Sequence, residues 1–368
     1  MKTLQKTYLK AWKKANKLGP EKTIKILKKK GLTGRGGADF PTWLKWELTR
    51  KTKSKERIII CNADEGEPGT FKDKLILEKN PENVIEGILI AAYCIDSKEA
   101  YIYLRGEYAY LKDKLRKTIK KILKATKSDL YLEIIEGAGA YICGDETAII
   151  SSIENKRGYP NFKPPYPSQK GLYNKPTLIN NVETLANVPL ALINKDWNNH
   201  SRLFSISGDV LRPGVYELKI GTRLEKIAKK VQAKNPKAVY FGASGGCIYY
   251  EPNLIIDQKN LCKKNVMLGT CSLIFVNKKR NILDIAINIA QFFTHESCGK
   301  CTPCREGNIH ILNLLERIKS KKATEKDLQL LEKLSIIIKD TSLCGLGQTC
   351  TNHILTAIRH FKEDFQVK

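Results

Sequence analysis

The spacing of apolar residues changes along the chain, and each change predicts a different kind of structure. Residues 1–30 carry apolar side chains at helical spacing, with an interruption at Pro20, and predict amphipathic helix. Between residues 57 and 154, short apolar runs alternate with helical patterns. The predicted strands are 57–61, 100–104 and 130–135, and the predicted helices are 81–94, 111–125 and 148–154. This alternation is typical of an α/β sheet.

Near residue 201 the pattern changes to alternating apolar and polar residues, and it is helical from residue 282 onward. Two alternating segments flank Pro213-Gly214 and predict a hairpin, which with one helix and further strands makes a small α+β module. The elements predicted here are strands 205–210, 215–218, 238–241, 254–256 and 272–276, and helices 223–231, 282–293, 306–320, 324–339 and 351–365. We therefore expect three domains, which are N-terminal helices with an α/β domain (1–198), an α+β domain (199–280) and a helical domain (281–368).

A glycine-rich segment lies between the N-terminal helical pattern and the first predicted strand. Glycines occupy positions 31, 34, 36 and 37, with Arg35 among them and Lys45 following. Because glycine lacks a Cβ, successive backbone N–H groups can turn toward one anion, and a following helix N-terminus favours the same charge. The segment is a candidate nucleotide-phosphate site, although glycine clusters more often make simple turns. It is neither a Walker A loop nor a dinucleotide fingerprint, since no strand precedes it.

Acidic residues gather in two loops next to predicted strands. Asp64, Glu65 and Glu67 follow the strand 57–61, and crowding three carboxylates there costs repulsion. A second loop, 137–147, combines glycines with the pair Asp145-Glu146 ahead of a helix. Turn chemistry alone could explain such loops, but ligands in α/β sheets bind at the carboxyl ends of strands. We therefore favour an interpretation as ligand loops.

Four cysteines near the C-terminus have the spacing of an iron–sulfur site. Cys298, Cys301 and Cys304 are separated by two residues each, and Cys344 follows forty residues later. Three close thiolates with one distant thiolate suit a [4Fe–4S] cluster. Zinc remains the alternative, although it usually takes its four cysteines as two separated pairs. An antiparallel helical bundle would bring the two cysteine loops to the same end.

The composition narrows the possible partners and location. The chain has 368 residues and a formal charge of +26, but the excess is lysine scattered along helices, without an arginine patch interleaved with aromatics. We therefore expect no nucleic-acid binding. No apolar run is long enough to span a membrane, and no secretory signal opens the chain. Eleven cysteines then indicate a reducing environment. We expect a cytoplasmic protein, held at most peripherally at the inner face of a membrane by partner subunits.

Together, these segments resemble the NADH-oxidising flavoprotein subunit of NADH:quinone oxidoreductase (the 51 kDa family of respiratory complex I). They are equally similar to the diaphorase subunits of NAD-linked hydrogenases and formate dehydrogenases. The motifs that carry the resemblance are 34–38, 61–69, 140–148, 180–184 and the cysteine run 298–304 with Cys344. The resemblance implies a Rossmann-like FMN-binding domain, a ubiquitin-like domain of the soluble-ligand-binding type, and a C-terminal helical bundle that carries a [4Fe–4S] cluster.

The resemblance also implies which residues serve each cofactor. The glycine loop and Lys45 would lie beside FMN and NADH, and Phe40 and Tyr166 would stack on adenine. Glu67 and Glu146 would act on NADH together with Lys163, and Glu65 and Asp145 belong to the same ligand loops. The implied flavin contacts are Gly34, Arg35, Gly36, Gly37, Asn62, Asp64, Tyr141, Gly144, Asn180, Asn181 and Thr184, and the implied cluster ligands are Cys298, Cys301, Cys304 and Cys344.

The implied reaction is hydride transfer from NADH to FMN, followed by single-electron transfer to the [4Fe–4S] cluster and to partner iron–sulfur subunits. The expected partners are a thioredoxin-like [2Fe–2S] subunit and a larger iron–sulfur subunit, both separate chains. The alternative is the equivalent NAD(P)H-linked subunit of a soluble or electron-bifurcating hydrogenase or formate dehydrogenase. Asp39 and Trp43 stand where the family has glycine, and Leu48 replaces an adenine-stacking aromatic. These departures motivate a further alternative, a cluster-bearing scaffold that no longer binds NADH.

Overall fold

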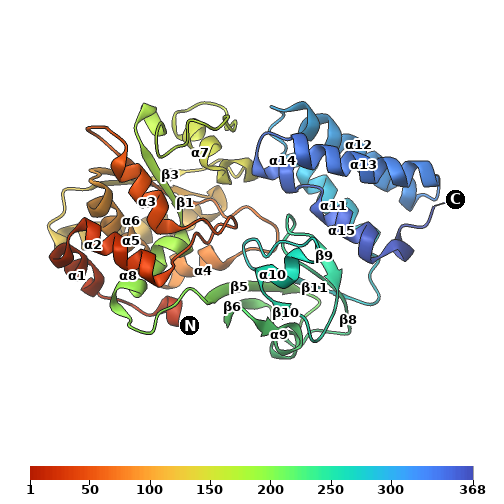
Figure 1. The fold of residues 1–368 in the computed structure, drawn as a ribbon, viewed down its shortest axis with the longest axis horizontal. Coiled ribbons are helices and arrows are strands. Elements are labelled where there is room, and N and C mark those ends of the chain that lie inside the picture. The colour runs from red at the N-terminus through yellow and green to blue at the C-terminus, as the bar shows by residue number, and fades with distance from the viewer. Residues whose placement is uncertain (368) are drawn as a thin grey trace. The chain divides into compact units, whose positions relative to one another are not determined.

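The computed structural model describes residues 1–367, and the chain divides into two compact units (Figure 1). The first unit contains Met1–Gly66 and Phe71–Leu203. The second unit contains Glu67–Thr70 and the chain from Phe204 onward. The short segment Glu67–Thr70, which lies within the first predicted acidic loop, therefore belongs to a different unit from the residues on either side of it.

The first unit is built on four parallel strands in the order β3-β2-β1-β4. The strands are β1 (Ile58–Ala63), β2 (Glu99–Leu104), β3 (Tyr131–Glu136) and β4 (Thr177–Asn181). The central strands β1 and β2 are almost entirely buried, as expected for a parallel sheet with helices on both faces. The three predicted strands of this sheet are confirmed. The fourth strand lies where no strand was predicted, because five residues that end in two asparagines give a weak pattern.

Eight α-helices accompany this sheet in the part of the first unit that the structure describes (Figure 1). Gly19 separates the first two, with a left-handed φ of 83° that ends one helix before Pro20 begins the next. Helices α3, α4 and α8 were not predicted. The helices are α1 (Lys10–Leu18), α2 (Pro20–Lys30), α3 (Thr42–Lys51), α4 (Lys72–Lys79), α5 (Pro81–Ile95), α6 (Lys112–Thr126), α7 (Glu146–Ile153) and α8 (Val182–Ile193).

Helices α5 and α8 form the apolar centre of this unit. Both are buried over nearly their whole length, so neither shows the one-sided pattern of a surface helix. At Gly87 the helices approach so closely that a Cβ would lie 2.1 Å from the carbonyl oxygen of Leu185. Pro189 lies inside α8, which explains why a helix was not predicted there.

The second unit contains a five-stranded sheet in the order β6-β5-β11-β8-β9, and a two-stranded sheet of β10 with β7. Strand β11 runs parallel to β5 and antiparallel to β8. The predicted hairpin strands are neighbours in this sheet, as β5 and β6. The strands are β5 (Ser201–Gly208), β6 (Gly214–Lys219), β7 (Thr222–Arg223), β8 (Pro236–Tyr240), β9 (Cys247–Tyr249), β10 (Ile255–Ile256) and β11 (Ser272–Asn277).

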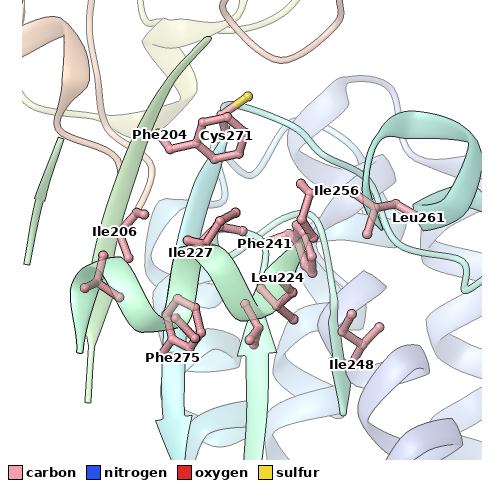
Figure 2. Close-up of a cluster of buried hydrophobic side chains, with 14 of the residues drawn as sticks. Phe204, Ile206, Leu224, Ile227, Phe241, Ile248, Ile256, Leu261, Cys271 and Phe275 are labelled. Carbon is pink, nitrogen blue, oxygen red and sulfur yellow. The ribbon is translucent and has the colours of Figure 1, made fainter. Parts of the chain in front are cut away.

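A hydrophobic cluster fills the space between this sheet and helix α9 (Leu224–Val231) (Figure 2). Phe204 and Phe275 contribute from β5 and β11, while Leu224 and Ile227 contribute from α9. Each of these four side chains is at most 1% exposed. The helix therefore covers one face of the sheet, which is the arrangement expected of an α+β module.

The C-terminal part of the second unit is helical. Gly307 allows α12 and α13 to pack closely, since a Cβ there would lie 2.5 Å from the Ile338 side chain. The last predicted helix ends earlier than expected, at His360, and α14 was not predicted. The helices of this unit are α9, α10 (Gln258–Cys262), α11 (Ile282–Glu296), α12 (Thr302–Lys319), α13 (Glu325–Thr341), α14 (Gly345–Thr349) and α15 (Asn352–His360). The overall fold class agrees with the prediction. It is α/β with a parallel sheet, followed by an α+β module and a helical C-terminal region. The three domain boundaries stay a prediction.

Candidate functional site

The candidate site of the first unit lies at the carboxyl ends of β1 and β4. The chain leaves β1 toward β2 and β3 on one side and returns to β4 on the other, so the strand order reverses between β1 and β4. Open α/β sheets bind ligands at such a switch point. Asn62 and Asn181, two of the predicted flavin contacts, are register partners at the last paired position of these strands. Cys61 and Asn180 are the preceding pair.

The glycine loop is fixed against the end of β4. Its two ends are joined by a bridge between Thr33 and Pro41 and by a 2.8 Å hydrogen bond from Gly34 N to Phe40 O. The backbone N–H of Arg35 donates to Thr184 Oγ1 at 2.9 Å. A Cβ on Gly36 would touch the Asn181 side chain at 3.5 Å. The loop therefore lies beside the same strand end that supplies the predicted asparagines.

The loops that follow β1 and β3 also meet at this edge of the sheet. Asn62 Nδ2 donates to the carbonyl oxygen of Gly144 at 2.9 Å. A Cβ on Gly66 would lie 3.0 Å from Tyr141 Cδ2 and 3.2 Å from its Cα, which leaves little room for a side chain. Three sequence-distant segments, the glycine loop and these two loops, are thus gathered around the ends of β1 and β4.

Glu146 is paired with two lysines from other segments. Lys45 Nζ lies 3.0 Å from Glu146 Oε2, and Lys163 Nζ lies 2.6 Å from Oε1. Burial raises the pKa of this carboxyl, but the two ammonium groups more than offset it, so the pKa lies below its usual value. The Lys45 ammonium is also 5.9 Å from the centre of the exposed Phe40 ring. Lys45, Glu146 and Lys163, predicted separately, therefore form one charged group.

Asp145 and Glu65, two of the predicted cofactor residues, also cap helices. Asp145 precedes α7 and accepts from Thr147 N at 2.8 Å and Ala148 N at 3.2 Å. Glu65 is buried and accepts from Asp73 N at 2.9 Å and Lys74 N at 3.0 Å, at the start of α4. Burial and the nearby Asp73 raise the pKa of Glu65 to about 7. These contacts are with backbone N–H groups of the protein. The predicted cofactor role of both residues stays a prediction.

A buried ionic cluster supports the asparagine at the end of β4, and it was not predicted. Lys72 is 1% exposed and its ammonium lies 2.7 Å from Asp73 Oδ1 and 3.0 Å from Glu183 Oε2. Burial alone would lower the pKa of Lys72, but Asp73, Glu183 and Glu65 raise it above the usual value. The second oxygen of Asp73 accepts from Asn181 Nδ2 at 2.5 Å. The sequence signal for this cluster is an adjacent Lys-Asp pair at a helix start, which is common and therefore weak.

Trp46 is another contributor that was not predicted. Its indole Nε1 donates to Asn180 Oδ1 at 2.8 Å, and the side chain is fully buried. This hydrogen bond orients the amide of a predicted flavin contact from the side of α3. An unpartnered tryptophan N–H would be costly in this interior, so the pairing fixes both side chains.

The departures from the family pattern are accommodated locally. Asp39 has a left-handed φ of 54°, and its carboxylate accepts from Thr33 and lies 2.7 Å from Arg202 Nη2. Its charge is therefore paired within the first unit. Lys28 lies 4.2 Å over the Trp43 ring. Leu48 and Tyr166 are exposed, at 46% and 52%, so both are open to contact with a ligand.

Glu67, the other predicted catalytic residue, belongs to the second unit. Its Oε2 accepts from Thr270 Oγ1 at 2.7 Å, and its Oε1 accepts from the backbone N–H of Ser244 at 3.2 Å and from the Ser244 hydroxyl. Gly242 beside it has a left-handed φ of 63°, which favours glycine, and a Cβ there would lie 2.6 Å from Glu67 Oε1. The carboxylate is thus held by loops of the second unit, and its role toward NADH stays a prediction.

The cysteine loops of the second unit meet at one end of the helical region, as predicted. Cys301 directly precedes α12 and Cys344 directly precedes α14. A Cβ on Gly347 would lie 2.5 Å from Ser342 and 3.2 Å from Cys304 Cβ, so the Cys344 loop packs onto Cys304. The positive end of the long helix α12 favours thiolate charge near its start.

The sulfur of Cys304, one of the four predicted ligands, lies among polar side chains. Asn308 Nδ2 lies 3.3 Å and Ser297 Oγ 3.4 Å from its sulfur. A hydrogen bond with Cys350 and these two contacts outweigh burial and lower the pKa of Cys304 to about 7. Burial raises the pKa of the Cys298 thiol.

Within residues 1–367, no three His, Cys, Asp or Glu side chains converge on the position of one metal ion.

Comparison with known proteins agrees with this division of the chain. Residues 27–190 match the Nuo51 FMN-binding domain, and residues 284–368 match the NADH-ubiquinone oxidoreductase-F iron–sulfur binding region. The chain is 42% identical to the NADH-quinone oxidoreductase F subunit of Aquifex aeolicus over 97% of its own length and 88% of that protein. This chain belongs to the Nuo51 family. The FMN-binding domain lies in the first unit except for Glu67–Thr70, and the iron–sulfur region lies in the second.

Hydrogenase subunits are equally recognisable relatives of this Nuo51-family chain. It is 40% identical to the alpha subunit of the NAD-reducing hydrogenase HoxS of Cupriavidus necator, over 95% of the chain and 61% of that subunit. A solved NAD⁺-reducing [NiFe]-hydrogenase in the H₂-reduced state matches with a TM-score of 0.92 and 35% identity. The match covers 98% of this chain and 65% of the hydrogenase chain, so the hydrogenase relatives are substantially longer.

These findings confirm the predicted family, fold class and cofactors, FMN and a [4Fe–4S] cluster. They also confirm the predicted class of activity, an NADH-oxidising iron–sulfur flavoprotein. The relatives are named as subunits, which supports assembly of this chain with other subunits. Among residues 1–367, no helix is both long and apolar enough to cross a membrane. The roles of individual site residues stay predictions.

Proposed function

We propose that the first unit binds FMN and NADH at the carboxyl edge of its sheet, and that the electrons leave through a [4Fe–4S] cluster held by the second unit. The observation that carries this proposal is the position of the glycine loop, tied to Thr184 and packed on Asn181 at the β1–β4 switch point. FMN, when bound, accepts an electron pair from NADH and can release electrons one at a time.

The residues of this chain would bind and orient the two nucleotides. The glycine loop offers backbone N–H groups and little steric bulk at the strand ends, which suits a phosphate-bearing ligand. Asn62, Asn180 and Asn181 present amides whose orientation is fixed by Gly144, Trp46 and Asp73 respectively. An amide that is held in place offers hydrogen bonds to flavin ring atoms without an entropy cost at binding.

The charged group of Lys45, Glu146 and Lys163 is proposed to hold NADH. Two cations share one carboxylate, so the group keeps a net positive charge that attracts the phosphates of the dinucleotide. Phe40 and Tyr166 are exposed rings that could stack on adenine. The pairing of Asp39 with Arg202 removes the electrostatic objection to nucleotide binding at this loop.

The cluster is proposed to be held by Cys298, Cys301, Cys304 and Cys344. We further propose a thioredoxin-like [2Fe–2S] subunit and a larger iron–sulfur subunit as partners, in a cytoplasmic complex. A second candidate function is that of the equivalent subunit of a hydrogenase. It is supported by the similarity of nearly the whole chain to the solved NAD⁺-reducing [NiFe]-hydrogenases. Co-purification of native partner subunits, identified by mass spectrometry, distinguishes a quinone-reducing complex from a hydrogenase.

The test of the nucleotide site uses Gly36→Val, whose branched side chain would occupy the cradle beside Asn181. We expect the purified variant to lose bound FMN while its circular dichroism spectrum is unchanged. The control is Lys120→Ala on the exposed face of α6, which should keep a full complement of FMN and the bleaching of flavin absorbance by NADH. Full FMN content in Gly36→Val, or wild-type protein whose flavin is not bleached by NADH, would contradict the proposal.

A further inference from the structure

Cys350 is a fifth cysteine at the predicted cluster site, outside the ligand spacing. It ends α14 and is 1% exposed. Its thiol is hydrogen-bonded with Cys304, and the charge of Cys344 also acts on it. Its sequence position, six residues after Cys344, gives no ligand pattern. The fold nevertheless places it against one predicted ligand and near another.

The sulfur of Cys304 is surrounded by three side-chain donors. Ser297 and Asn308 contribute a hydroxyl and an amide at 3.4 and 3.3 Å, and Cys350 contributes its thiol. The Asn308 amide is itself fixed, because it also donates to the Cys304 carbonyl oxygen at 2.8 Å. The donors come from the segment before α12, from α12 itself and from the end of α14, so both cysteine loops contribute.

The position of Cys350 is fixed by close packing of α14. Gly347 leaves no space for a side chain between α14 and Cys304, and the carbonyl oxygen of Gly347 lies 3.2 Å from the Cys350 sulfur. The thiol hydrogen therefore has two possible acceptors, this neutral carbonyl and the Cys304 sulfur. A negatively charged sulfur is the stronger acceptor.

Hydrogen bonds to a cluster ligand favour the reduced cluster. Reduction adds negative charge that is shared with the ligand sulfurs, and donors aimed at a sulfur stabilise that charge. Three donors on one sulfur would raise the reduction potential above that of a cluster without them. When the Cys304 sulfur is less charged, the Cys350 thiol can instead donate to the Gly347 carbonyl oxygen. The thiol hydrogen therefore has an acceptor in both states of the cluster.

We propose that Cys350 is not a ligand but a donor to Cys304 that, with Ser297 and Asn308, raises the reduction potential of the [4Fe–4S] cluster. This inference rests on the proposed assignment of Cys304 as a cluster ligand. Cys350 acts only through Cys304, so its substitution shifts the potential without removing iron.

The experiment is an EPR-monitored potentiometric titration of the full chain, reconstituted anaerobically with iron and sulfide. In Cys350→Ala we expect a lower midpoint potential. The equilibrium constant for one-electron reduction of the cluster should fall by about threefold to tenfold, and a tenfold change corresponds to 59 mV. Cys350→Ser keeps a donor and should restore most of the shift. Ser297→Ala should lower the potential independently, and it covers the case in which Cys350→Ala fails to fold. The exposed Cys262→Ala is the matched control and should titrate as the wild type.

Two results would overturn the inference. One is an unchanged potential in both Cys350→Ala and Ser297→Ala. The other is loss of cluster iron in Cys350→Ala, which would make Cys350 a ligand. Cys304→Ser separately tests the assignment on which the inference rests, because a cluster that keeps its full iron content in that variant would remove Cys304 from the ligand set.

Discussion

Glu146 shows how one residue can serve both the fold and a ligand. Its carboxylate joins Lys45 from α3 to Lys163 from the loop after α7, and so connects parts of the chain more than a hundred residues apart. Without the carboxylate, the two ammonium groups would repel each other across the site. With it, the group is ordered and still carries a net positive charge for an anionic ligand.

We expect Glu146→Gln to lower the unfolding free energy at neutral pH by up to about 1 kcal/mol. The folded-state pKa of Glu146 lies below its usual 4.5, so its ionised form stabilises the fold above that pH. This contribution is lost as the pH falls through the folded-state value, and the difference between wild type and variant should shrink there. Denaturant unfolding at several pH values measures the effect, with the exposed Glu133→Gln, on β3 of the same unit, as control. A difference that persists unchanged in acid would refute the electrostatic explanation.

The raised pKa of Glu65 predicts that its contribution to the unfolding free energy depends on pH with the opposite sign. Its pKa is raised from 4.5 to about 7, so between these values the folded state holds a proton that the unfolded state has released. Stability should therefore fall as the pH rises across that window. Glu65→Gln imitates the protonated carboxyl and should remove this slope from the unfolding free energy. The exposed Glu133→Gln should leave it in place, and an equal slope in wild type and Glu65→Gln would show that another group is responsible.

The candidate site was predictable as residue types but not as contacts. The glycines, acids and asparagines were recognised because they interrupt the apolar pattern at strand ends. Their partners come from segments that only the fold brings together, such as Trp46 on Asn180 and Asp73 on Asn181. Cys350 was missed for the same reason, because its proximity to Cys304 depends on close packing at Gly347.

Among the helices, the crossing of α5 and α8 depends on a single glycine. Helix propensity alone predicts that Gly87→Ala stabilises α5 by about 1 kcal/mol. The structure predicts the opposite sign, because the new Cβ would lie 2.1 Å from the Leu185 carbonyl oxygen and must push the helices apart. Overpacking of this kind costs about 1–3 kcal/mol or more. The melting temperature of Gly87→Ala in thermal unfolding decides between these two predictions, and Lys121→Ala on α6 is the surface control. A raised melting temperature would show that the helices can move apart freely.

The predictability of the elements followed the strength of their periodicity. Helix α6 was predicted well because its apolar residues repeat on one face, with Leu115, Ile119 and Ile122 buried. Helix α8 was missed because it is buried on all sides and contains Pro189. Strand β4 was missed because it is short and ends in asparagines. The missed elements thus lacked a clear one-sided or alternating pattern, whereas the buried central strands β1 and β2 gave recognisable apolar runs.

At the scale of the whole molecule, the two cofactors belong to different units. The FMN-binding domain at residues 27–190 lies within the first unit except for Glu67–Thr70, and the iron–sulfur region lies within the second. Each unit has its own sheet and its own buried core. Damage to one cofactor site should therefore leave the other site filled.

Cys344→Ser tests this separation. Cys344 is the only predicted ligand outside the run 298–304, so its loss should deprive the cluster of its attachment to the α13–α14 loop. We expect reduced iron and acid-labile sulfide, a weakened EPR signal, unchanged FMN content and continued bleaching of the flavin by NADH. The exposed Cys262→Ser, in the same unit, should keep both cofactors. Loss of FMN together with iron would mean that the units do not hold their cofactors independently. Full retention of iron would mean that another group takes the fourth position, and Cys350, which is hydrogen-bonded with Cys304, would be the first candidate.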